Sequence, residues 1–127
     1  MRSALVIDDD DQVRSMIAMI LMRAGFAVSE ACDGEQGIRL MRAILPDVVV
    51  TDIFMPHQDG IGVLQHVKSG PGPRPPVIAI SGGSPRVQGD YLDAAKRLGA
   101  DAVIQKPFLP QTLIEAIERA SGASRKG

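Results

Sequence analysis

The stretch "ALVIDDDDQVRSMIAMIL" (residues 4–21) places an apolar run, four consecutive acids and an amphipathic pattern in direct succession. Residues 4–8 are typical of a short strand that is covered on both faces. The apolar residues that follow recur at helical spacing and would line one helix face: Val13, Met16, Ile17, Ile20 and Leu21. The stretch therefore predicts a β-strand and an α-helix, with the acids at the turn between them.

The same alternation continues along the chain. Further strands are expected at residues 26–31, 47–53, 77–81 and 102–105. Further helices are expected around residues 38–45, 61–68, 91–100 and from Pro110 onward, and the first helix should stop at Gly25. Five strands alternating with five helices predict an α/β fold in which helices cover both faces of a parallel sheet, a (βα)5 three-layer sandwich. The methionines are expected to pack on helix faces, at positions 16, 19, 22 and 41.

Length and composition narrow the class of protein. The 127 residues fit one domain, and the net charge of −1 favours neither nucleic acid nor an anionic membrane as a partner. The longest apolar run, residues 16–22, is too short to span a bilayer, and acids within the first eight residues do not fit a secretory signal. Cys32 is the one cysteine, which excludes an intrachain disulfide. A cytoplasmic location is expected.

Polar residues stand where the predicted strands end. Asp8 and Asp9 end the first strand, Asp52 the third, Ser81 the fourth and Lys106 the fifth. In a parallel α/β sheet these ends meet at one edge, so the five side chains should converge there. Neighbouring carboxylates need a cation, and oxygen ligands without histidine or cysteine suit Mg²⁺, or Mn²⁺, better than zinc.

A magnesium site of this kind commonly recruits phosphate oxygens as further ligands. The chain could bind a phosphate group noncovalently or accept one on a carboxylate, and Asp52 is the best-placed nucleophile. Lys106 and the Ser81 hydroxyl would then contact phosphoryl oxygens. Asp10 and Asp11 are expected to cap the first helix instead of binding metal. His57 and His66 lack partners at metal-ligand spacing and are expected to be ordinary polar positions.

Four motifs carry a resemblance to a known family: "LVIDDD", "PDVVVTDIFMPHQDG", "IAISGG" and "GADAVIQKPF". In this order they resemble the receiver domain of two-component response regulators, over residues 4 to about 120. The resemblance implies a flavodoxin-like fold with strand order 2-1-3-4-5 and phosphorylation of Asp52 by a histidine kinase or a histidine phosphotransfer protein. It implies that Mg²⁺ is ligated by Asp9, Asp52 and the backbone carbonyl of Phe54, with Asp8 acting through water. It assigns catalytic roles to Ser81 and Lys106 and a cis peptide to Lys106–Pro107.

By the same resemblance, residues 1–121 form the receiver domain and residues 122–127 a flexible C-terminal tail. Such a protein is not an enzyme beyond its own phosphoryl transfer and autodephosphorylation. Its small-molecule substrates would be phosphodonors only, and its output would be contact with a downstream protein or relay of the phosphoryl group. Two features depart from the family pattern: Val103 replaces the usual aromatic residue, and the loop at 81–90 is longer and rich in glycine. The aromatic switch of the family is therefore not expected in its usual form.

Three alternatives are weighed against this interpretation. The chain could be the receiver fragment of a larger multidomain regulator. It could be a magnesium-dependent phosphatase that uses an aspartyl-phosphate, but such enzymes usually have an acid two residues after the nucleophile, where Phe54 stands. It could be a nucleotide- or flavin-binding flavodoxin relative, but four acids after the first strand would repel phosphate.

Overall fold

A five-stranded parallel sheet forms the centre of the protein. The structure is a computed structural model and describes residues 2–53, 60–69, 74–81 and 99–126. The strands are β1 (Ser3–Ile7), β2 (Ala27–Ala31), β3 (Val48–Asp52), β4 (Val77–Ser81) and β5 (Ala102–Gln105). Their order in the sheet is β2-β1-β3-β4-β5, and every neighbouring pair is parallel. The predicted strand order is confirmed.

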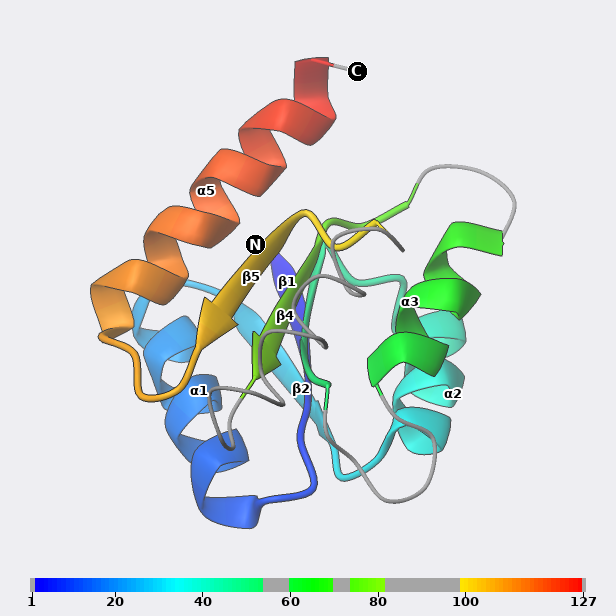
Figure 1. The fold of residues 1–127 in the computed structure, drawn as a ribbon, viewed down its shortest axis with the longest axis horizontal. Coiled ribbons are helices and arrows are strands. Elements are labelled where there is room, and N and C mark those ends of the chain that lie inside the picture. Colours follow the sequence, from blue (N-terminus) through cyan, green and yellow to red (C-terminus); the bar gives the residue numbers. More distant parts are fainter. Residues whose placement is uncertain (1, 54–59, 70–73, 82–98, 127) are drawn as a thin grey trace.

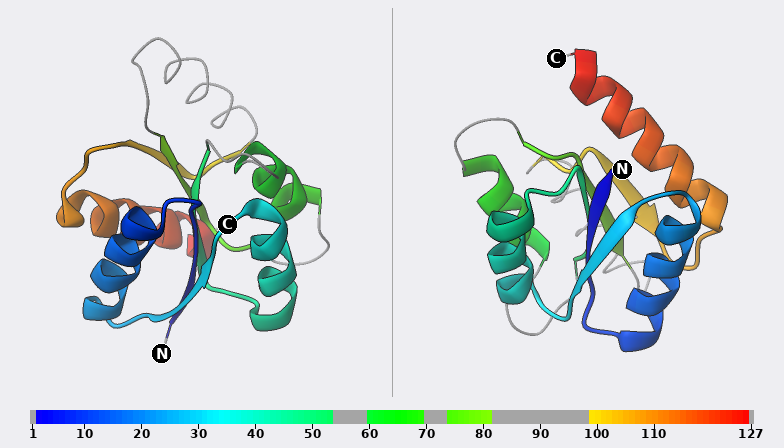
Figure 2. Two further views of the ribbon diagram at one scale, coloured as in Figure 1. Left: turned by 90° about the horizontal axis from the view of Figure 1, so that it is seen from below. Right: turned by 180° about the vertical axis from the view of Figure 1, so that it is seen from behind.

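Helices cover both faces of the sheet. The described helices are α1 (Asp11–Arg23), α2 (Gly34–Ile44), α3 (Gly60–Ser69) and α5 (Pro110–Lys126). Figures 1 and 2 show α1 and α5 on one face and α2 and α3 on the other, as a three-layer α/β sandwich requires. The helix expected at residues 91–100 lies outside the described residues except at its end, where Gly99 has the positive φ of 103° that suits a helix stop. None of the helices in the described ranges is long and apolar enough to cross a membrane.

The pleat of the strands divides the core into two clusters. In every strand, even-numbered apolar residues pack toward α1 and α5, and odd-numbered ones pack toward α2 and α3. Val6 and Val50 belong to the first cluster, for example, and Ile7 and Val49 to the second. Side chains of a strand alternate between its two faces, so burial on both sides explains why the three central strands, β1, β3 and β4, are largely apolar.

Local signals define the ends of the helices. The Asp10 carboxylate accepts hydrogen bonds from the backbone N–H groups of Gln12 and Val13 at 2.9 and 3.1 Å, which confirms it as the N-cap of α1. Gly25 follows α1 with a φ of 97°, as expected of a glycine just after a helix. α5 continues to Lys126, through most of the segment for which the sequence predicts a tail, while the domain boundary at residue 121 stays a prediction.

The expectation for the methionines is wrong for three of the four. Met16, Met19 and Met22 on α1 are 45–55% exposed, whereas Met41 on α2 is buried. The buried face of α1 is centred on Ile17 and Leu21. At about 100° per residue, the three methionines fall roughly 120–180° away from the centre of that face, so they point to solvent.

Candidate functional site

The carboxyl ends of four strands bring the predicted polar residues to one edge of the sheet. Asp8 and Asp9 directly follow β1, Asp52 and Ser81 end β3 and β4, and Lys106 directly follows β5. Because β1 pairs with β3, β3 with β4 and β4 with β5, these four ends are neighbours in space. The edge therefore holds three carboxylates, a hydroxyl and an ammonium group.

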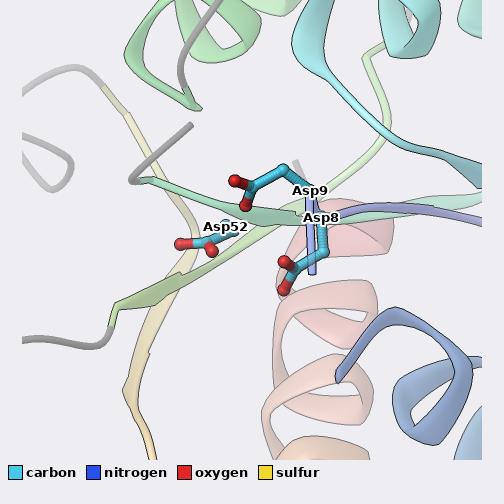
Figure 3. A group of neighbouring side chains, drawn as sticks. All are labelled: Asp8, Asp9 and Asp52. Atoms are coloured by element: carbon cyan, nitrogen blue, oxygen red, sulfur yellow. The ribbon is translucent and has the colours of Figure 1, made fainter. Parts of the chain in front are cut away.

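The alternation of the strands sorts these five side chains between the two sides of the sheet. Asp8, Asp52 and Lys106 have even numbers and lie toward α1 and α5, whereas Asp9 and Ser81 lie toward α2 and α3. Figure 3 shows the carboxylates of Asp8 and Asp9 leaving the chain in different directions, with that of Asp52 close to both. Two adjacent acids can thus approach one point from opposite sides.

The three carboxylates are close enough to share a cation. Asp8, Asp9 and Asp52 each offer one oxygen, and these oxygens lie within 4.8 Å of one another. Asp8 is completely buried, Asp52 is 6% exposed and Asp9 is exposed. An oxygen-only donor set that opens to solvent at one residue fits a hard cation that keeps several waters, as Mg²⁺ does. The residues present therefore fit the magnesium ion that the sequence predicts.

Lys106 provides the positive charge at this edge. Its Nζ donates hydrogen bonds to Asp52 Oδ2 at 3.1 Å and to Asp8 Oδ2 at 3.3 Å. Burial acts to lower the pKa of Lys106, but the charges of Asp52 and Asp8 outweigh it and raise that pKa above its ordinary value. The lysine is therefore fully charged at neutral pH. The peptide bond that follows it, Lys106–Pro107, is cis, as the family resemblance implies.

Asp8 titrates far from the ordinary range of an aspartate. Burial raises its pKa to about 6, and the charge of Asp52 acts in the same direction. The N–H of Asp10, which donates to Asp8 Oδ1 at 2.9 Å, and the ammonium of Lys106 counteract only part of this rise. In the metal-free protein, ionisation of Asp8 is therefore less favourable than in the unfolded chain.

This raised pKa predicts that Asp8→Asn stabilises the metal-free protein at pH 8. In the unfolded chain the pKa of Asp8 is near its ordinary value of 3.8, so between about pH 4 and pH 6 the folded state holds more bound proton than the unfolded state. The contribution of Asp8 to the free energy of unfolding therefore falls as pH rises through that window. We expect the substitution to raise this free energy by about 1–3 kcal/mol at pH 8 and to change it little at pH 4. Urea unfolding in EDTA at both pH values measures the difference, and an equal effect at both would contradict the prediction.

Ser81 places a buried hydroxyl beside this group. Within the part of the chain that the structure describes, its Oγ has no hydrogen-bond partner. Its carbonyl accepts a hydrogen bond of 2.7 Å from the backbone N–H of Lys106, which ties the ends of β4 and β5 together. A buried hydroxyl in this state can donate to an incoming oxygen.

Of the other candidate positions in the sequence, some lie outside the described residues and the rest lie on α3 and β5. Phe54 and His57 lie outside the described residues, as does the glycine-rich loop beyond Ser81. His66 is half-buried on α3. Val103 is half-buried in β5 and packs on the core cluster under α2 and α3, and its part in any switching motion stays a prediction.

Two residues beside the site are not found by the sequence argument. The Thr51 hydroxyl, buried in β3, donates to the carbonyl oxygen of Asp52 at 3.1 Å. Arg14 on α1 donates to the carbonyl oxygen of Asp8 at 3.0 Å. Spacing on the helix could suggest an ion pair between Arg14 and Asp11, three residues earlier. The contact with Asp8 depends on how α1 sits against β1, which no local pattern shows.

Known proteins share both the sequence pattern and the fold. Residues 4–118 match the family model of the response regulator receiver domain. The protein named as probable chemotaxis protein CheY of Rhizobium etli is 35% identical over 122 residues, which cover 94% of this chain and 92% of that protein. The transcriptional regulatory protein PdtaR of Mycobacterium tuberculosis is 32% identical over 98% of this chain.

Solved structures agree with these relatives. A CheY-like response regulator receiver domain protein from Methanospirillum hungatei has a TM-score of 0.86 at 25% identity, covering 99% of this chain and 98% of that one. NtrX from Brucella abortus, in complex with ADP, has a TM-score of 0.88 at 30% identity over 98% of this chain.

The relatives differ in length. The chain spans 59% of PdtaR, 28% of the NtrX chain and 41% of a probable transcriptional regulator ycf27 from Guillardia theta, which is 36% identical over 86% of this chain. In the long and the short curated relatives alike, the segment that matches this chain is 111–126 residues long. Since the family model covers nearly all of the sequence and the sheet has the matching order, the chain belongs to the family of response regulator receiver domains.

Proposed function

We propose that this chain accepts a phosphoryl group on Asp52 from the phosphohistidine of a histidine kinase or of a histidine phosphotransfer protein. The observation that carries the proposal is the contact of Lys106 Nζ with both Asp52 and Asp8, which gathers an ammonium group and carboxylates at one sheet edge. Receiver domains of this family bind Mg²⁺ at an acidic pocket and interact with histidine kinases and downstream effectors. The identity of the acceptor and of its donors is the proposal.

The transfer is a displacement at phosphorus. An oxygen of the Asp52 carboxylate forms a bond to phosphorus while the bond from phosphorus to the donor imidazole nitrogen breaks, and the electron pair of that bond returns to the imidazole ring. Lys106 Nζ, 3.1 Å from Asp52 Oδ2, is positioned to donate to one phosphoryl oxygen, and the Ser81 hydroxyl to another. A Mg²⁺ ion held by Asp9, Asp52, the Phe54 carbonyl and, through water, Asp8 would supply positive charge for the same oxygens. Mn²⁺ is the alternative ion for such oxygen ligands.

The modified domain would signal by contact with another protein or by passing the phosphoryl group to a further histidine. It would act in the cytoplasm, with phosphodonors as its only small-molecule substrates and with neither nucleic acid nor membrane as a partner. A second form of the same function is a receiver that regulates further domains of a longer protein. PdtaR and NtrX, of which this chain covers 59% and 28%, are the observation behind this second form, while the probable CheY of Rhizobium etli, covered to 92%, matches the first.

Phosphoryl uptake from a small phosphodonor tests the function. We expect acetyl phosphate with Mg²⁺ to add one phosphoryl group per chain, seen as intact mass, and we expect EDTA to prevent the addition. The metal is needed because three carboxylates with one lysine leave the edge too negative to admit a phosphoryl group unaided. Uptake that proceeds equally well in EDTA would contradict the metal site, and no uptake under either condition would contradict the proposed function.

A further inference from the structure

We propose that Arg14 is a positioning residue for the acidic site. Its guanidinium holds the peptide bond between Asp8 and Asp9, and thereby sets the directions of the two carboxylates that would bind Mg²⁺ from β1. The inference rests on the proposed metal site and names a residue of α1 on which the affinity of that site depends.

All three nitrogens of the Arg14 guanidinium have partners, and each partner lies on a different segment. Nη1 donates to the Asp8 carbonyl oxygen at 3.0 Å, Nη2 pairs with Asp11 Oδ1 at 2.7 Å, and Nε pairs with Glu30 Oε1 at 3.2 Å. These partners belong to the end of β1, to α1 and to β2. A planar guanidinium can donate hydrogen bonds in three directions at once and in one fixed geometry. An ammonium group on a flexible stem cannot fix the positions of three acceptors in this way.

The bond to the Asp8 carbonyl acts on both acids. That carbonyl is part of the peptide unit that links Asp8 to Asp9. Asp8 is anchored further by its own N–H, which donates to the Ala31 carbonyl at 3.1 Å. Within residues 2–53, 60–69, 74–81 and 99–126, the Asp9 carboxylate has no hydrogen-bond or ion-pair partner. Its direction is therefore set by the backbone that Arg14 holds.

A simpler role for Arg14 would be to tie α1 to β2 and stabilise the fold. Its two acidic partners are exposed, with 83% of the Asp11 side chain and 43% of the Glu30 side chain accessible. Surface ion pairs of this kind contribute about 0–1 kcal/mol to stability. The Arg14 side chain itself is only 16% exposed, and its partner at the site is the backbone carbonyl of a buried residue. The geometry thus places the strongest constraint at the acidic pair.

Charge and positioning predict opposite changes in Mg²⁺ affinity. Arg14 is a cation near three carboxylates, so removal of its charge alone would strengthen the attraction of the site for a divalent cation. Loss of positioning would weaken binding, because the two acids would no longer be held for a common ion. Residues that orient metal ligands typically account for about 10- to 100-fold in metal affinity.

Calorimetric titration of MgCl2 into the metal-free protein separates these roles. We compare wild type, Arg14→Lys and Arg14→Met with Arg39→Lys and Arg39→Met, matched substitutions of an exposed arginine on α2. We expect the dissociation constant for Mg²⁺ to rise about tenfold in both Arg14 variants and to stay unchanged in both Arg39 variants. Thermal melting without metal reports the effect on the fold separately.

Three results would overturn the inference. Unchanged affinity in Arg14→Lys with tighter binding in Arg14→Met would show a pure charge effect. Lower melting temperatures with unchanged Mg²⁺ affinity in both variants would show a structural role only. If Arg14→Met does not fold, Arg14→Lys alone decides: weaker binding supports the inference and wild-type affinity overturns it.

Asp9→Asn in the same titration separates failure of this inference from failure of the metal site. If the wild type binds no Mg²⁺, or Asp9→Asn binds it equally well, the metal site and the inference both fail. If binding depends on Asp9 but is unaffected at Arg14, only the inference fails.

Discussion

Asp52→Asn is expected to abolish phosphoryl uptake from acetyl phosphate in Mg²⁺ while the protein stays folded. The substitution replaces the attacking carboxylate with an amide of nearly the same shape, which has no anionic oxygen to attack phosphorus. We expect a rate loss of at least about a thousandfold, so that no phosphorylated species is seen in the intact mass over the time in which wild type is fully modified.

Asp47→Asn is the matched control for this experiment. Asp47 directly precedes β3 at the opposite end from Asp52, is exposed, and accepts a hydrogen bond from the backbone N–H of Ser3 at 2.7 Å. This variant should take up phosphoryl groups as wild type does. Equal modification of Asp52→Asn and wild type would rule out Asp52 as the acceptor, and modification of Asp8 or Asp9 in its place would be located by peptide mapping.

Lys106→Met is expected to lower the free energy of unfolding of the metal-free protein by about 3 kcal/mol at pH 8. The substitution keeps much of the side-chain volume but leaves Asp8 and Asp52 as buried carboxylates without their shared ammonium partner. Removing one member of a buried ion pair typically costs about 3–5 kcal/mol, and the partial exposure of Lys106 places the effect near the lower end.

The same variant carries a pH signature. Without Lys106, the pKa of Asp8 should rise above its present value of about 6, so protonation should relieve part of the repulsion at higher pH than in wild type. The stability deficit should therefore shrink between pH 8 and pH 5. Urea unfolding across this range, beside Arg39→Met as a surface control, measures it. A deficit below about 1 kcal/mol at pH 8, the size expected of a surface pair, would show that the lysine does not compensate the two acids.

The strands and helices can be predicted from the sequence for one physical reason, and the convergence of the polar residues for another. Apolar runs mark strands that are covered on both faces, and helical spacing marks their partners, so the alternation of elements is visible from local pattern alone. The placement of Asp52 and Lys106 at strand ends is enough to predict that they meet, since parallel strands end at one edge. The order of the strands is different. Periodicity finds each strand but does not identify its neighbours, so the order 2-1-3-4-5 follows from the family resemblance.

What could not be predicted depends on how elements pack. Met16 falls within the apolar spacing of α1 yet lies about 120° round the helix from the centre of its buried face, and only the docking of the helix decides that it is exposed. The contact of Arg14 with the Asp8 carbonyl depends on the angle at which α1 packs against β1, and the spacing of residues along the chain does not show that angle. The raised pKa of Asp8 likewise follows from complete burial, which a strand-end position does not require.

The separation of Asp52 and Lys106 along the chain has a consequence for biosynthesis. Lys106 lies 54 residues after Asp52 and 98 after Asp8, so a ribosome makes every carboxylate of the site before it makes the lysine. At about 5–20 residues per second, the nascent chain carries the acids of β1 and β3 for roughly 3–10 seconds before their counter-charge is added. During that interval β1 and β3 can pair along their apolar length, but their carboxyl ends repel each other. The segment that follows β5, the last strand to be synthesised, thus supplies the positive charge that allows the carboxyl ends of β1 and β3 to pack side by side.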